Sequence, residues 1–214
     1  MFIVRVFTFS PIQENTYLLI NEERQAIVID PGCYGQTEEE ALGDFFTQNG
    51  VQPKLLLQTH CHLDHVFGTR WVAGAYGLTP HLHPLEEELL HLAPAFGLSW
   101  DLPFDSYQGP LTYLEAGSTL LFGKDRLDVL FVPGHSPGHL CFYCAAQGFV
   151  IGGDALFRGS IGRTDLPRGN GPLLEKSIRE VLFTLPDETV VYPGHGPETT
   201  IGYEKRHNPY LRLD

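Results

Sequence analysis

One local arrangement recurs along this chain: a short apolar run typical of a buried β-strand, then a small or turn-forming residue, then a histidine or an aspartate. Apolar runs of this length bounded by turns predict strands, so the polar side chains are expected just beyond the strand ends. Imidazole nitrogens and carboxylate oxygens are ligands of borderline divalent metals. The arrangement therefore predicts a hydrolytic metalloenzyme. The candidate ligands are His60, His62, Asp64, His65, His135, Asp154 and His195.

The strongest signal lies between His60 and His65, where three histidines and one aspartate fall within six residues. A polar loop that holds histidines by chance rarely reaches this density. In a tight loop after a strand, alternate residues can point into one pocket. His60 and His62 can therefore hold one ion, while Asp64 and His65 face an adjacent position. Two ions about 3.5–4 Å apart are the usual geometry for a bridging hydroxide.

The later candidates are weaker when each is taken alone. His135 and His195 each follow a Pro-Gly pair, which by itself indicates only a turn, and Asp154 could simply cap a helix or a turn. The repetition of the pattern beside the denser cluster favours ligands. Asp154 has one further property, because a carboxylate can bridge two cations and an imidazole cannot.

Length and charge limit the class of protein. The chain has 214 residues and no Ser/Gly-rich linker, so we expect one domain spanning residues 1–214. The 26 acidic and 14 basic residues leave a formal charge of −12, which argues against nucleic acid and against an anionic membrane as partners. The opening residues turn polar too soon for a signal peptide, and no apolar run approaches the length of a membrane span. We expect a cytoplasmic protein.

The remaining pattern predicts two β-sheets packed face to face with helices outside. Thr37 and Glu40 have capping-box spacing, which places the start of the first helix near Thr37. Strands are predicted at 2–7, 16–20, 26–29, 54–58, 120–122, 127–132, 140–145, 149–151 and 189–192. Helices are predicted at 37–48, from about 65 to 76, at 85–92 and at 173–182.

The four cysteines do not form the framework of a small secreted protein. Cys141 and Cys144 have the spacing of a redox or zinc-binding pair. They lie three residues apart on one predicted strand, so their side chains face opposite sides of the sheet. This placement favours buried thiols that behave as small apolar side chains.

The motif His60-x-His62-x-Asp64-His65, with the later histidines and Asp154, resembles the metallo-β-lactamase fold superfamily. The resemblance implies an α/β fold, a four-layer αβ/βα sandwich in which two mixed β-sheets are flanked by helices. It also implies two divalent metal ions, with zinc expected and iron or manganese as alternatives. Carried over by position, metal 1 is bound by His60, His62 and His135, metal 2 by Asp64, His65 and His195, and Asp154 bridges the two.

Three segments further resemble the glyoxalase II-like (hydroxyacylglutathione hydrolase-like) members of that superfamily: residues 156–167, 194–202 and 204–210. The resemblance implies that a metal-bridging hydroxide hydrolyses a small-molecule thioester such as S-lactoylglutathione. Asp64 and Asp154 are the catalytic carboxylates in this scheme. Glyoxalase II carries a C-terminal helical extension that helps to bind glutathione, whereas this chain ends at Asp214. We therefore expect weak saturation by glutathione thioesters and tolerance of other thiol carriers.

Several alternatives stay open at this point. Arg158 and Arg163, in the Gly-rich loop after Asp154, are candidates for binding an anionic part of the substrate, although either could pair with an acid such as Asp165 and stabilise the loop. Cys61 lies in a segment that resembles the persulfide dioxygenases, which use one iron held by two histidines and an aspartate. A non-enzymatic metal-binding module is a third interpretation, which the complete ligand set disfavours. The sequence does not indicate the oligomeric state.

Overall fold

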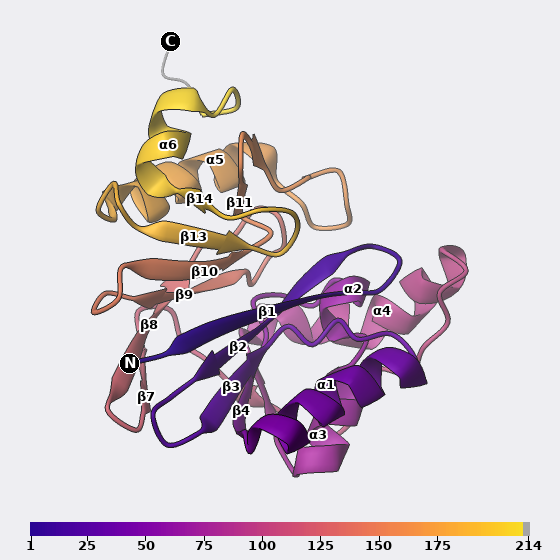
Figure 1. Cartoon of the computed structure of the whole chain (residues 1–214). Helices are drawn as coiled ribbons and strands as arrows, with labels where there is room; N and C mark the ends of the chain where they lie inside the picture. Colours follow the sequence, from indigo (N-terminus) through magenta and orange to yellow (C-terminus); the bar gives the residue numbers. More distant parts are fainter. Residues whose placement is uncertain (212–214) are drawn as a thin grey trace. The chain divides into compact units, whose positions relative to one another are not determined.

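A computed structural model describes residues 1–211, so the last three residues of the predicted 1–214 domain lie outside the described part. The chain forms two compact units, Met1–Tyr113 and Leu114–Asp214 (Figure 1). Each unit contains its own mixed β-sheet and its own helices. Within the described residues, no helix has both the length and the apolar composition needed to cross a bilayer.

The first unit is built on a six-stranded sheet in the order β1-β2-β3-β4-β5-β6. The first three strands pair antiparallel across short turns, and the last three join in parallel because longer connections return the chain to the same end of the sheet. The strands are β1 (Ile3–Phe9), β2 (Glu14–Ile20), β3 (Gln25–Ile29), β4 (Gln52–Leu57), β5 (Pro80–Leu82) and β6 (Thr112–Tyr113).

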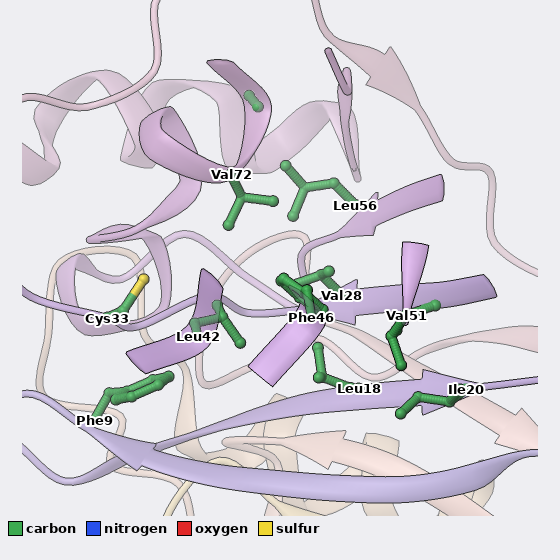
Figure 2. Packing of buried hydrophobic residues seen from close by; sticks show 12 residues of the cluster. Phe9, Leu18, Ile20, Val28, Cys33, Leu42, Phe46, Val51, Leu56 and Val72 are labelled. Carbon is green, nitrogen blue, oxygen red and sulfur yellow. The ribbon is translucent and has the colours of Figure 1, made fainter. Parts of the chain in front are cut away.

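Four α-helices and one 3₁₀ turn accompany this sheet. They are α1 (Gln36–Asn49), α2 (Leu63–Val66), α3 (Thr69–Tyr76), η1 (Pro84–Glu86) and α4 (Glu87–Ser99). The helices α1 and α3 place Leu42, Phe46 and Val72 against Leu18 and other apolar side chains of the strands, as Figure 2 shows. Burial of these side chains holds the two helices on one face of the sheet.

The structure corrects three details of the predicted helices. The predicted capping box is wrong, because α1 already begins at Gln36 after Gly35, which has a positive φ of 78° and provides no side-chain cap. The predicted helix from about residue 65 is two helices, α2 and α3, separated at Phe67 and Gly68. The predicted helix 85–92 extends to Ser99, because Pro94 is tolerated inside it.

The second unit has a six-stranded sheet in the order β14-β13-β10-β9-β8-β7, and a two-stranded hairpin of β11 and β12. Its strands are β7 (Thr119–Phe122), β8 (Asp125–Phe131), β9 (Leu140–Cys144), β10 (Phe149–Gly153), β11 (Leu156–Phe157), β12 (Ser160–Ile161), β13 (Val190–Pro193) and β14 (Thr199–Thr200). The helical segments are α5 (Gly171–Glu180), η2 (Leu182–Thr184) and α6 (Ile201–His207).

A separate apolar core joins the helices of the second unit to its sheet. Leu174 and Ile178 from α5 and Ile201 from α6 pack with Val150 and Val191 from neighbouring strands, and all five side chains are fully buried. In this sheet β10 and β13 run parallel, so their carboxyl ends lie at the same edge. The two units together confirm the predicted α/β class with two mixed sheets and flanking helices.

Candidate functional site

In the first unit, the predicted ligands occupy the segment between β4 and β5. The strands β3 and β4 are parallel, so Asp30 after β3 and Thr59 after β4 meet at one edge of the sheet. Asp30 is 2% exposed, and its Oδ1 accepts the backbone N–H of Thr59 at 2.6 Å, while Oδ2 accepts the Thr59 hydroxyl. These bonds anchor the start of the histidine segment at a defined position.

Asp30 also orients one of the predicted ligands. The Nδ1 of His65 lies 3.0 Å from Oδ2 of Asp30, so the ring proton is best placed on Nδ1 and the lone pair on Nε2. The Asp64 Oδ2 atom lies 3.7 Å from that Nε2. His65 is fully buried and Asp64 is nearly so. The Nε2 atom of His65 and the Oδ2 atom of Asp64 therefore lie close together and away from bulk water.

The histidine rings of this segment are gathered closely. The ring centroid of His60 lies 4.0 Å from that of His65 and 4.8 Å from that of His62. One donor atom each from Asp30, His60 and His65 lies within 4.8 Å of the others. Because the Asp30 oxygens already accept hydrogen bonds, we interpret Asp30 as a support of the ligands, as the hydrogen-bonded carboxylates behind metal-bound histidines are.

Two buried glutamates of the first unit were not singled out by the sequence pattern. Glu86 is fully buried, and its Oε2 accepts the backbone N–H of Cys61 at 2.8 Å. Burial raises the pKa of the Cys61 thiol well above its ordinary value, with a further contribution from Glu86. The Cys61 side chain packs with apolar residues such as Val66 and Leu90. The only sequence signal for Glu86 is its place in the first helical turn after β5.

Glu14, at the start of β2, is the second of these glutamates. Its Oε1 lies 3.9 Å from Nδ1 of His65, and its Oε2 lies 2.9 Å from the Thr16 hydroxyl oxygen. The Thr16 oxygen also lies 2.9 Å from the Asp30 carbonyl oxygen and accepts the N–H of Gly32 at 2.9 Å. Burial raises the pKa of the Glu14 carboxyl well above its ordinary value, although His65 acts in the opposite direction.

In the second unit, three strand ends bring the other predicted ligands together. His135 follows β8, Asp154 follows β10 and His195 follows β13. The Asp154 Oδ2 atom lies 3.6 Å from Nε2 of His135 and 3.6 Å from Nε2 of His195. Two ligands of one tetrahedral zinc ion, each about 2.1 Å from it, lie about 3.4 Å apart. The spacing therefore fits Asp154, His135 and His195 as residues that would hold divalent metal.

The loop after Asp154 supports His135 through its backbone. The Nδ1 of His135 donates to the carbonyl oxygen of Arg163 at 2.8 Å, which leaves Nε2 to face Asp154. A Cβ at Gly162 would collide with the Asp154 carbonyl oxygen and approach the His135 ring, so only glycine allows the loop to lie this close. The Arg-containing loop is thus tied to the candidate ligands by main-chain atoms.

The two arginine side chains of this loop have other partners in the second unit. The Arg163 guanidinium forms a two-point contact with the Asp165 carboxylate, at 2.7 and 2.8 Å, on the exposed side of the loop. The contact lowers the pKa of Asp165 to about 2. Arg158 lies over the Tyr203 ring, with its guanidinium carbon 5.4 Å from the ring centroid. Their suggested role in binding substrate stays a prediction.

Comparison with known proteins agrees with this chemistry. The family model of the metallo-beta-lactamase superfamily matches residues 10–195. The chain is 38% identical to the probable metallo-hydrolase YqgX of Bacillus subtilis, over 94% of this chain and 93% of the relative. It is 35% identical to the hydroxyacylglutathione hydrolase GloC of Haemophilus influenzae, over 97% of each chain.

A solved structure extends the likeness to three dimensions. TTHA1623 in a di-iron-bound form superimposes with a TM-score of 0.88 and 42% identity, over 97% of this chain and 100% of that chain. The matched range includes the described strand ends of both units, and residues 10–195 contain all seven candidate ligands. The chain therefore belongs to the metallo-beta-lactamase superfamily, as one of its metallo-hydrolases.

Proposed function

We propose that the chain is a thioesterase of glyoxalase II type that binds two divalent metal ions through the seven candidate ligands. The observation that carries the metal assignment is the Asp154 Oδ2 atom, which faces the Nε2 atoms of His135 and His195 at equal distances of 3.6 Å. The likeness to GloC, over 97% of each chain, supports a thioester as the substrate class. The formal charge of −12 favours a small molecule over a nucleic acid.

Divalent ions bound by such ligands lower the pKa of a coordinated water to near neutrality and polarise a carbonyl group. The chain's own residues prepare this chemistry. Asp30 and the Arg163 carbonyl oxygen hold the Nδ1 protons of His65 and His135, so that each ring presents Nε2. A thiolate leaving group needs little protonation, because a thiol is a fair acid. No serine or cysteine nucleophile is required, and Cys61 is buried among apolar side chains.

Purified chain tests the proposal directly. We expect about two divalent ions per chain by elemental analysis, and hydrolysis of S-lactoylglutathione that stops when the metals are removed. Zinc is the first candidate, and iron and manganese are the alternatives, since the related TTHA1623 has been solved in a di-iron form. Hydrolysis that is unchanged in a metal-free chain would contradict the proposal.

The substrate series decides what the site recognises. Thioesters of one acyl group on glutathione, on a dipeptide thiol and on a small thiol separate recognition of the acyl group from that of the carrier. Arg158→Ala and Arg163→Ala, with Arg206→Ala as the matched exposed control, show whether the loop arginines bind the carrier. The Arg163 variant keeps the carbonyl oxygen that supports His135, so a raised KM reports the side chain alone.

One alternative uses the same kinds of ligand. An iron-dependent dioxygenase acting on glutathione persulfide would consume oxygen, whereas a thioesterase would not. An oxygen electrode with the iron-loaded chain separates the two. Oxygen uptake on the persulfide, with one iron per chain and no thioester hydrolysis, would replace the proposed thioesterase with the dioxygenase.

A further inference from the structure

His139 is a buried histidine of the second unit that does not belong to the predicted ligand set. It lies just before β9 and is fully buried. Its Nε2 atom accepts the backbone N–H of Asp154 at a distance of 3.0 Å. An imidazole nitrogen that accepts a hydrogen bond carries no proton, so the ring proton of His139 resides on Nδ1.

A second side chain, two residues further along and inside β9, supports the adjacent peptide. Cys141 lies two residues beyond His139, and residues i and i+2 of an extended chain place their side chains on the same face. The Cys141 thiol donates to the carbonyl oxygen of Gly152 at 3.4 Å, and its sulfur lies 4.0 Å from Nδ1 of His139. The two side chains therefore hold the chain on both sides of Gly153.

The segment they hold has little stiffness of its own. Gly152 and Gly153 precede Asp154, and Gly153 adopts a positive φ of 49°. Glycine allows a wide range of backbone conformations, so the two residues alone do not determine where the Asp154 carboxylate points. The strand pairing of β10 with β13 is also irregular between Ile151 and Gly153. The contact on the Asp154 N–H therefore helps to set its direction, together with the hydrogen bond from the Gly194 N–H to the Gly153 carbonyl oxygen.

We propose that His139 is a positioning residue that directs the Asp154 carboxylate toward the Nε2 atoms of His135 and His195. The hydrogen bond fixes the Asp154 backbone, and the fixed backbone places Oδ2 at 3.6 Å from both rings. This inference rests on the proposed function only in taking Asp154 as a metal ligand. Loss of such a supporting contact weakens metal binding by about 10–100-fold in metalloproteins.

Two substitutions of His139 separate the hydrogen bond from the packing. In His139→Gln the amide oxygen lies near the position of Nε2 and can accept the Asp154 N–H. In His139→Met the side chain has similar length, but the thioether is a weak acceptor. The matched controls are His207→Gln and His207→Met, because His207 lies on α6 and makes a tilted ring contact with Tyr203. All variants are made in the full chain.

The affinity for Zn²⁺ is measured by competition with a chromogenic chelator, and the cobalt-loaded chains are compared by their visible spectra. We expect His139→Gln to bind within a few-fold of wild type. In His139→Met we expect the more weakly bound ion to be lost about 10–100-fold more readily, with an altered cobalt spectrum. Both His207 variants should match wild type. Thermal unfolding of the metal-free chains shows whether each variant is folded.

The outcomes separate this inference from the proposed function. Wild-type affinity and an unchanged cobalt spectrum in His139→Met overturn the positioning role. Equal losses of metal affinity in the Gln and Met variants, with equal losses of metal-free stability, also overturn it, because packing alone would explain them. A wild-type chain that binds no metal overturns both proposals. If wild type binds metal without hydrolysing thioesters, and the Gln and Met variants differ as expected, the positioning role stands and the thioesterase alone fails.

Discussion

At the scale of single residues, Asp154 has the most demanding place among the candidate ligands, since one of its oxygens faces two imidazoles. Asp154→Ala removes this anion, and two cations held near each other then repel with little compensation. We expect loss of at least one metal ion per chain and of hydrolysis by more than about 100-fold, equivalent to about 2.7 kcal/mol. Elemental analysis and initial rates measure both.

The control for this prediction is Asp165→Ala, which removes an exposed carboxylate paired with Arg163 in the same loop. It should keep wild-type metal content and unfold within about 0.5 kcal/mol of wild type, as surface substitutions do. Circular dichroism of Asp154→Ala should resemble that of wild type. Full metal content and turnover in the Asp154 variant would remove it from the ligand set.

The four thiols provide a second residue-level prediction. All four cysteines are free and buried, and burial raises the pKa of the Cys33 and Cys61 thiols. A raised pKa leaves less thiolate at pH 8, and the thiolate is the reactive form. We expect an aromatic disulfide reagent to modify none of the thiols of the native chain in the time that it modifies free cysteine. After unfolding in guanidinium it should titrate four per chain. Rapid modification of the native chain would contradict the burial of these side chains.

The candidate ligands and their supports differ in how far sequence reveals them. His60 and His65 stand out because they are dense and follow an apolar run. Glu86 and His139 do not, since each acts on a backbone N–H that is remote in the sequence. Such a partner becomes visible only when the fold brings the segments together. The hydrogen bond from His135 to Arg163 is hidden for another reason, because a backbone carbonyl has no residue preference.

At the scale of elements, α5 packs directly on the turn that precedes His135. Gly134 has a φ of 134°, and a Cβ there would collide with the backbone of Leu174 in α5. Gly134→Ala should therefore destabilise the chain by roughly 3 kcal/mol or more, since both an unfavourable φ and a backbone clash oppose it. Chemical denaturation measures the free energy of unfolding.

Gly148→Ala is the control for Gly134→Ala. Gly148 also has a positive φ, of 63°, but no atom lies within 4 Å of the position of an added Cβ. Only the conformational cost remains, roughly 1 kcal/mol. If the two substitutions destabilise equally, the close packing of α5 on the Gly134 turn is not what requires glycine there.

The limits of the predicted elements have local explanations. The apolar runs and turn residues of the sequence predict the positions of most strands. The sequence does not predict where α1 begins. Gly35 turns the chain into this helix, and Glu38 in its first turn accepts the N–H groups of Ser10 and Tyr34. Thr37 and Glu40 have the residue types of a capping box, but Thr37 lies two residues after Gly35, the residue that actually caps α1. The prediction of a helix at 85–92 falls short of Ser99, and α4 contains Pro94, a residue that is unfavourable inside a helix.

At the scale of the whole molecule, bound metal should contribute to the stability of the chain. A ligand that binds only the folded chain stabilises it by about 4 kcal/mol when its free concentration is 1,000 times its Kd. For a chain of this size, we expect removal of the metals with a chelator to lower Tm by roughly 10 °C. Scanning calorimetry before and after restoring Zn²⁺ measures this. An unchanged Tm would show that the folded chain does not retain metal.

Two predictions concern the whole chain, the two mixed sheets and the single domain, and only the first is confirmed by the structure. The two mixed sheets follow from strands that alternate with helices, and the structure confirms them. The single domain spanning residues 1–214 stays a prediction, because the chain is grouped into two compact units. A linker rich in Ser or Gly is the sequence signal of a boundary, and Tyr113 and Leu114 at this division provide none.

The hydrogen bonds around Thr16 have a consequence for counting protons. Its hydroxyl has one proton but lies 2.9 Å from two oxygens, that of the Asp30 carbonyl and Oε2 of Glu14, and it already accepts the N–H of Gly32. A carbonyl oxygen can only accept, whereas a carboxyl group can also donate when it is protonated, so the Thr16 proton is assigned to the Asp30 carbonyl. The contact with Glu14 is then satisfied by a proton on the glutamic acid, in line with its raised pKa. The formal charge of −12 counts Glu14 as an anion, whereas this arrangement of hydrogen bonds requires its neutral form.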